Sequence, residues 1–227
     1  MDQPFSLSLG LEDTHVLITG GNGLIGRRVV AAFLAAGSKV SIIDLPSTCT
    51  APDINPSRAE FHPADITDAA ALNAAFSKAE AIFGPVECCL AIASIDLSSL
   101  PQTESICDAD PEVWRKVFDV NIHGTFLTAQ QLCLLTRRVK RRYRTVATER
   151  FREECERFGR QWQWEESEAA VGLARPVPID DVARTFLFLA SERYSGSTHG
   201  QLLHVDSGKM GTLQWLPEDL AARQQAA

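Results

Sequence analysis

The sequence predicts an α/β fold, a doubly wound parallel sheet covered by helices on both faces. Short apolar runs alternate with helical patterns along the first half of the chain, and short links join them, an order typical of this architecture. Several of the runs are apolar nearly throughout, as expected for parallel strands buried on both sides. With 227 residues, 45% of them hydrophobic, the chain is long enough for one such domain and short for a second.

The expected elements of the first half follow one another without a break in the pattern. Asp68 is a suitable N-cap residue, Gly84-Pro85 is a helix stop, and Asp110-Pro111 is a second helix start. In chain order we expect a strand His15–Thr19, a helix ending at Gly37, a strand Lys39–Asp44, a strand over 59–66, a helix over 68–83, a strand Val86–Ile95 and a long helix over 110–138.

The pattern changes after Arg137, where the chain becomes charged and amphipathic and shows no strand signal. It returns with a helix over 180–191, for which Asp180 or Asp181 is the expected cap, and with a final short strand Leu202–Val205. We expect this last strand to pair beside strand Val86–Ile95, which gives a sheet with a reduced number of strands.

Composition and charge argue against several functional classes. The net charge of −7 disfavours binding of nucleic acid or of an anionic membrane by bulk electrostatics. The chain shows no signal-peptide pattern at its start and no apolar run long enough to span a membrane. The six cysteines form no C-x-x-C pattern and the histidines show no ligand spacing. We therefore expect reduced thiols, no metal and a cytoplasmic location.

A glycine-rich turn between the first strand and the first helix predicts a dinucleotide site. Gly21, Gly23 and Gly26 fit the pattern G-x-G-x-x-G, and Gly20 adds a fourth position that tolerates a positive φ. In this setting the glycines allow a tight turn and a close approach of a pyrophosphate, whose charge the helix N-terminus stabilises. We interpret residues 1–135 as the dinucleotide-binding half of a Rossmann-type domain.

Asp44 closes the second strand, where a carboxylate would accept hydrogen bonds from the adenosine ribose. A 2′-phosphate there would meet a like charge, and the next basic residue along the chain is Arg58. The sequence therefore favours NAD over NADP. The alternative is an ordinary exposed acid at a strand end.

These residues resemble the short-chain dehydrogenase/reductase family. Thr19–Gly26 is similar to the family's T-G-x-x-x-G-x-G loop, although Leu24 stands where the family has its middle glycine, and segments near 175–208 resemble its C-terminal signature. The resemblance implies one catalytic residue, Asn121, as part of a proton relay. The cofactor contacts that it implies are Gly20, Asn22, Gly23, Leu24, Ile25, Gly26, Asp44, Asp65, Ile66, Ala93 and Thr148.

The chain also departs from the family pattern. It contains no Tyr-x-x-x-Lys, the pair in which a nearby ammonium lowers the tyrosine pKa for acid–base transfer; its tyrosines are Tyr143 and Tyr194. By the resemblance, a central block that holds this pair is missing between Leu135 and Tyr143. Residues 145–172 then resemble a substrate lid, and 173–211 the C-terminal helix and strand, all within a single domain over 1–227.

The resemblance implies an oxidoreductase that moves a hydride between NAD(H) and an alcohol/carbonyl pair, acting on a small molecule in a biosynthetic pathway. The missing pair leaves two other classes open, a dinucleotide-binding pseudoenzyme and a redox-neutral cyclase or isomerase. A truncated or mis-spliced form of an active enzyme is a further possibility. We also expect that the protein can form a homo-oligomer.

Overall fold

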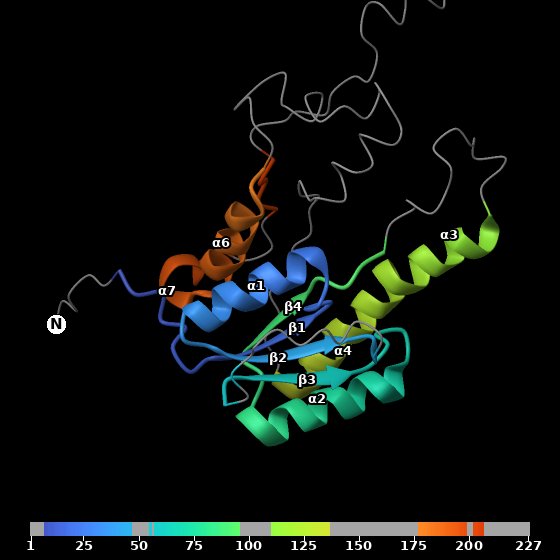
Figure 1. Cartoon of the computed structure of the whole chain (residues 1–227), viewed down its shortest axis with the longest axis horizontal. Helices are drawn as coiled ribbons and strands as arrows, with labels where there is room; N and C mark the ends of the chain where they lie inside the picture. Colours follow the sequence, from blue (N-terminus) through green and yellow to red (C-terminus); the bar gives the residue numbers. More distant parts are fainter. Residues whose placement is uncertain are drawn as a thin grey trace, which may run out of the picture. The chain divides into compact units, whose positions relative to one another are not determined.

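The computed structural model describes residues 7–46, 55, 57–95, 110–136, 177–198 and 202–206. Within them the sheet is parallel and four-stranded, with the order β3-β2-β1-β4 (Figure 1). Its strands are β1 His15–Thr19, β2 Lys39–Asp44, β3 Ala59–Pro63 and β4 Cys88–Ala91. The predicted fold class is therefore confirmed. This order reverses direction between β1 and β4, the switch point beside which doubly wound sheets bind ligands.

Alternate residues of β1 enter two separate cores, as the two-residue period of a strand requires. Val16 and Ile18 are buried in a cluster with residues of α1 (Leu24–Ala35) and α6 (Ile179–Ala190), while Leu17 is buried with residues of α2 (Ala69–Phe83) and α4 (Thr125–Thr136). Helices α1 and α6 thus cover one face of the sheet, and α2 and α4 cover the other (Figure 1).

The signals that begin and end α2 act as the sequence predicts. The Asp68 carboxylate accepts hydrogen bonds from the N–H groups of Ala70 and Ala71, and Gly84 ends the helix with a φ of 84°. An N-cap of this kind satisfies backbone donors that have no partner inside the helix. It also fixes where the chain leaves β3.

The expected long helix is interrupted. It consists of α3 (Pro111–Phe118), a π-helical turn η2 (Asp119–Gly124) and α4. Asp110 caps α3 through the N–H of Glu112, as predicted. At the end of the π-helical turn a Cβ on Gly124 would lie 2.6 Å from Ile66 Cδ1, so the helix packs closely on the chain that follows β3. Turns of this kind are often found at functional sites.

Two predictions about the C-terminal part are wrong. Helix α6 begins after Pro178, so the two expected caps lie inside its first turn. There the Asp180 carboxylate binds Arg28 and the Asp181 carboxylate binds Arg184. The Arg28 guanidinium also holds the pKa of Asp180 below its usual value. A short helix α7 (Glu192–Ser195) follows.

Leu202–Val205 form no strand, so the sheet of the described residues has no strand from this segment beside β4. An isolated short apolar run is a weak strand signal, because pairing depends on a partner that the local sequence does not reveal.

The described residues 7–46, 57–95, 110–136 and 178–198 belong to one compact unit of the chain. The sheet and its covering helices lie within this unit. Among the helices that the structure describes, none is long and apolar enough to cross a membrane.

Candidate functional site

The carboxyl end of β1 leads into a turn that only glycine fits at two positions. Gly20 has a φ of +72°, and a Cβ there would lie 2.5 Å from Ala93 Cα. A Cβ on Gly26 would lie 2.0 Å from the Gly20 carbonyl oxygen. The turn therefore packs on itself and on the chain after β4. Its contact with Ala93 lies at the switch point of the sheet.

The first turn of α1 presents unpaired backbone donors. Gly23 is the N-cap residue and has no side chain to satisfy them. The N–H groups of Leu24, Ile25 and Gly26 have no hydrogen-bond partner among the described residues. Such a helix N-terminus, with its partial positive charge, can bind an anion such as a phosphate.

Asp44 lies beside the same turn, at the end of β2. Its Oδ2 accepts a hydrogen bond of 2.9 Å from the Asn22 N–H, and its Oδ1 accepts one of 2.8 Å from the Leu45 N–H. Each carboxylate oxygen can accept about two hydrogen bonds. Each therefore has an acceptor position left for a ligand hydroxyl.

Asp65 and Ile66 follow β3 at the same edge of the sheet. The Asp65 carboxylate accepts hydrogen bonds from the N–H and hydroxyl groups of Thr67. The Ile66 side chain is buried in the core against Gly124. Any contact from Ile66 to a ligand would consequently come from its backbone.

Asn121 lies in the π-helical turn and pairs with the chain that follows β4. Its amide nitrogen donates to the Ile95 carbonyl at 2.7 Å, and its amide oxygen accepts from the Ile95 N–H at 2.9 Å. The side chain thus positions the backbone after β4. Its role in a proton relay stays a prediction, and Thr148 lies outside the described residues.

The structure adds one residue that the sequence analysis missed. The Arg27 Nε donates a 2.7 Å hydrogen bond to the Asn22 carbonyl, so this guanidinium belongs to the glycine turn. The chain after Asp44 has no basic residue before Arg58, whereas Arg27 comes from the helix after the glycine turn. Its place just behind G-x-G-x-x-G was the signal that could have revealed it.

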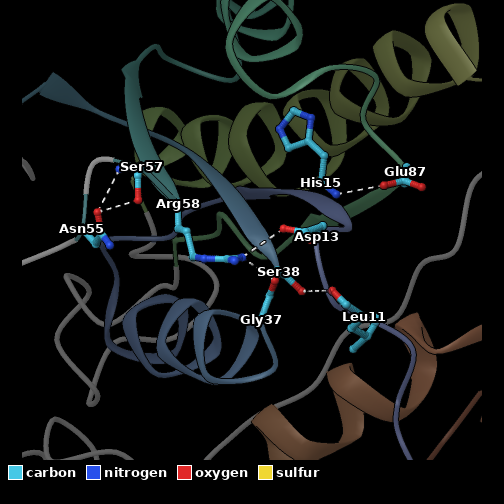
Figure 2. Close-up of polar contacts among 9 residues, drawn as sticks. All are labelled: Leu11, Asp13, His15, Gly37, Ser38, Asn55, Ser57, Arg58 and Glu87. Atoms are coloured by element: carbon cyan, nitrogen blue, oxygen red, sulfur yellow. Dashed lines mark hydrogen bonds and ion pairs between the residues drawn. The ribbon is translucent and has the colours of Figure 1, made fainter.

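The amino edge of the sheet, where the parallel strands begin, contrasts with the glycine turn because its polar residues are paired within the chain (Figure 2). His15, the first residue of β1, is buried; its Nδ1 lies 2.7 Å from the Gly84 carbonyl and its Nε2 lies 2.9 Å from Ser41 Oγ. Because a carbonyl only accepts, Nδ1 carries the proton and Nε2 accepts from the serine hydroxyl. Burial lowers the pKa of His15 below its usual value, although the hydrogen bond to Gly84 acts in the opposite direction.

The residues that precede the other strands are also paired. Ser38 donates to the Leu11 carbonyl, Arg58 donates to the Gly37 carbonyl and pairs with Asp13, and Glu87 accepts from the His15 N–H (Figure 2). This edge has its polar groups satisfied by the chain itself. The open donors and acceptors of the glycine turn lie at the carboxyl edge.

Sheet order, glycine turn and strand-end acid define a Rossmann-type α/β domain. The chain belongs to the short chain dehydrogenase family, whose model matches residues 14–141, more than half of the 227 residues. Members of this family use nicotinamide dinucleotides. The family prediction is thus confirmed, and the missing central block stays a prediction.

Curated relatives match about half of the chain. The chain is 33% identical over 130 residues to short chain dehydrogenases/reductase notP′ of Aspergillus versicolor, covering 53% of this chain and 43% of the relative. It is 30% identical over 129 residues to 2-(S)-hydroxypropyl-CoM dehydrogenase 3 of Xanthobacter autotrophicus, covering 55% and 49%. The chain spans about half the length of these relatives.

Solved structures share the fold. The structure of gox2181 has a TM-score of 0.73 at 20% identity, covering 88% of this chain and 96% of that one. A short-chain dehydrogenase/reductase from Brucella melitensis has a TM-score of 0.71 at 16% identity, covering 89% and 98%. At these identities the likeness establishes the fold alone.

Proposed function

We propose that the carboxyl edge of the sheet binds a nicotinamide dinucleotide. The observation that carries the proposal is the pairing of unbonded donors in the first turn of α1 with a strand-end carboxylate across one glycine turn. The donors fit a pyrophosphate, and Asp44 fits the adenosine ribose.

We propose NAD(H) as the preferred cofactor. The Asp44 carboxylate accepts ribose hydroxyls and disfavours a phosphate at the 2′ position, where two negative charges would meet. The two backbone donors already bound to Asp44 keep its oxygens beside the turn. Asp65 and the backbone of Ile66 extend the same edge toward the place of the adenine.

We propose that the protein acts as an oxidoreductase of short-chain dehydrogenase type on an alcohol/carbonyl pair. The bound nicotinamide supplies or accepts the hydride. The residues of this chain bind the pyrophosphate, orient the ribose and, through Asn121, hold the backbone after β4 in place. Because the 227 residues contain no Tyr-x-x-x-Lys, we assign no proton donor.

Titration calorimetry with NADH and NADPH tests the binding step. We expect the wild-type chain to bind NADH, and Asp44→Ala to weaken that binding by about tenfold or more, as expected for loss of hydrogen bonds to a charged group. Asp68→Ala is the matched control, because it removes a carboxylate from the same edge that only caps α2. Equal affinity in Asp44→Ala and wild type would contradict the proposed site.

A panel of ketones and secondary alcohols then tests the activity, with NADH absorbance as the readout. Turnover supports the oxidoreductase. Tight NADH binding without turnover of any member would instead favour the pseudoenzyme, and product formation without a change in NADH would favour a cyclase or isomerase.

We further propose a small-molecule substrate, a biosynthetic role in the cytoplasm and a second copy of the chain as partner. Trp114, Phe118, Ile122 and Phe126 support self-association, because each is at least 42% exposed along one helical run. Exposed apolar surface of this kind marks interaction sites. Light scattering on wild type and on Phe126→Lys measures it, and a monomer at all concentrations would contradict the proposal.

A further inference from the structure

We propose that Arg27 sets the balance between NAD and NADP at the site, by offering a guanidinium to the 2′-phosphate that Asp44 disfavours. This inference rests on the proposed dinucleotide site and names a residue that determines its specificity. With Arg27 in this role, NADP binds more weakly than NAD but measurably.

The geometry begins at Asn22, to which both charged groups are bound. Its N–H donates to Asp44 Oδ2 at 2.9 Å, and its carbonyl accepts from Arg27 Nε at 2.7 Å. The carboxylate and the guanidinium are therefore held by consecutive peptide groups of the same turn. No ion pair within 4.0 Å joins them in the described part of the chain, so neither neutralises the other by direct contact.

The second step concerns the donors that Arg27 has left. A guanidinium has five N–H donors, and the one on Nε is used by the Asn22 carbonyl. Arg27 is exposed, and its terminal nitrogens have no polar partner among the described residues. The Nε thus holds the guanidinium at the turn, while the two terminal nitrogens remain available for bidentate binding of a phosphate.

The neighbouring residue shows that this arrangement is particular to Arg27. Arg28 is the next residue of α1 and is also exposed, but its guanidinium binds the carboxylate of Asp180 on α6. One arginine of the pair thus serves the contact between helices, and the other lies at the turn. In folds of this class an arginine near the ribose accommodates a 2′-phosphate.

The test compares the dissociation constants of NADH and NADPH for wild type, Arg27→Gln, Arg27→Lys and the control Arg28→Gln. We expect Arg27→Gln to weaken NADPH by about tenfold, as for loss of a charge-assisted hydrogen bond, and to change NADH by less than about threefold. Arg27→Lys should restore part of the NADPH affinity, because it keeps the charge and loses the fork. Arg28→Gln should leave the ratio of the two constants unchanged.

Every other outcome contradicts either the proposed dinucleotide site or the role of Arg27, and the two cases can be told apart. If the wild-type chain binds neither dinucleotide, the proposed function fails. If Arg27→Gln weakens NADH and NADPH equally, Arg27 only holds the turn and this inference fails while the proposed function stands. The same conclusion follows if the ratio is equal in Arg27→Gln and wild type.

Discussion

The two edges of the sheet differ in whether their polar groups have hydrogen-bond partners within the chain. At the amino edge the residues that begin or precede the strands are bound within the chain. His15 is bound to Gly84 and Ser41, and Arg58 is bound to Gly37 (Figure 2). At the carboxyl edge the first turn of α1 leaves backbone donors unbound within the described residues.

This difference indicates which edge of the sheet can bind a ligand. Buried polar groups without partners are destabilising, so a fold keeps them paired wherever nothing else will bind them. The turn after β1 departs from that rule on the solvent side, and it does so beside a carboxylate. If this division is correct, a change at one edge should affect binding, and a change at the other should affect stability alone.

The largest effect on dinucleotide binding is expected from Gly26→Ala. Its Cβ would lie 2.0 Å from the Gly20 carbonyl oxygen and 2.7 Å from Gly21 Cα, so the turn cannot keep its shape. We expect loss of detectable NADH binding by calorimetry, together with destabilisation of about 1–3 kcal/mol in denaturant unfolding, the usual range for overpacking.

Gly84→Ala provides the control for a glycine at the amino edge. Its Cβ would meet nothing within 4 Å, but its φ of +84° disfavours alanine. We expect a loss of about 1–2 kcal/mol from the strained backbone and an unchanged dissociation constant for NADH. Binding by Gly26→Ala at wild-type affinity would show that the turn is not the site.

The sequence was sufficient to predict the sheet strands and helix caps whose signals are local. Asp68 and Gly84 begin and end α2 through contacts within a few residues, and the glycine turn and Asp44 were predicted on the same basis. The failures depend on long-range partners. Asp180 does not cap α6 because its carboxylate binds Arg28, which is 152 residues away in the chain.

The candidate site likewise has a part that the local sequence predicts and a part that it does not. Its backbone part follows from the glycine spacing, but the place of Arg27 depends on a side chain folding back onto the turn. The π-helical turn that holds Asn121 was also missed; its last residue, Gly124, packs against Ile66, which comes from a different part of the chain.

The largest effect on stability is expected from His15→Ala at the amino edge. The change leaves a cavity and removes the partners of the Gly84 carbonyl and the Ser41 hydroxyl. We expect a loss of about 2–4 kcal/mol in the free energy of unfolding. The affinity for NADH should be unchanged at a temperature where the variant is folded. The exposed His123 is the control, because its change to alanine should cost less than about 0.5 kcal/mol.

Acid should act on the amino edge through the same histidine. Burial lowers the pKa of His15 below the ordinary 6.5, so the unfolded chain binds a proton at this residue more readily than the folded one. The stability that depends on its neutral form is complete above that value and is lost as the pH falls through it toward the folded pKa. Between pH 7.5 and 6 we expect His15 to account for a loss of up to about 1 kcal/mol in the free energy of unfolding, measured in urea. A His15→Gln variant should show a shallower dependence, and stability that rises over this range would contradict the assignment.

The smallest effect is expected from Arg58→Ala, which tests whether the edges are independent. Arg58 donates to the Gly37 carbonyl at 2.7 Å and pairs with Asp13 at 3.3 Å, with 44% and 67% of the two side chains exposed. An exposed ion pair contributes little, and so we expect a loss below about 1 kcal/mol. Asp13→Asn separates the two contacts: its effect should vanish in high salt, which screens the ion pair, while the part of the Arg58→Ala effect due to the Gly37 hydrogen bond should persist. NADH affinity should be unchanged in both variants, and a change would mean that the amino edge acts on the glycine turn through the sheet.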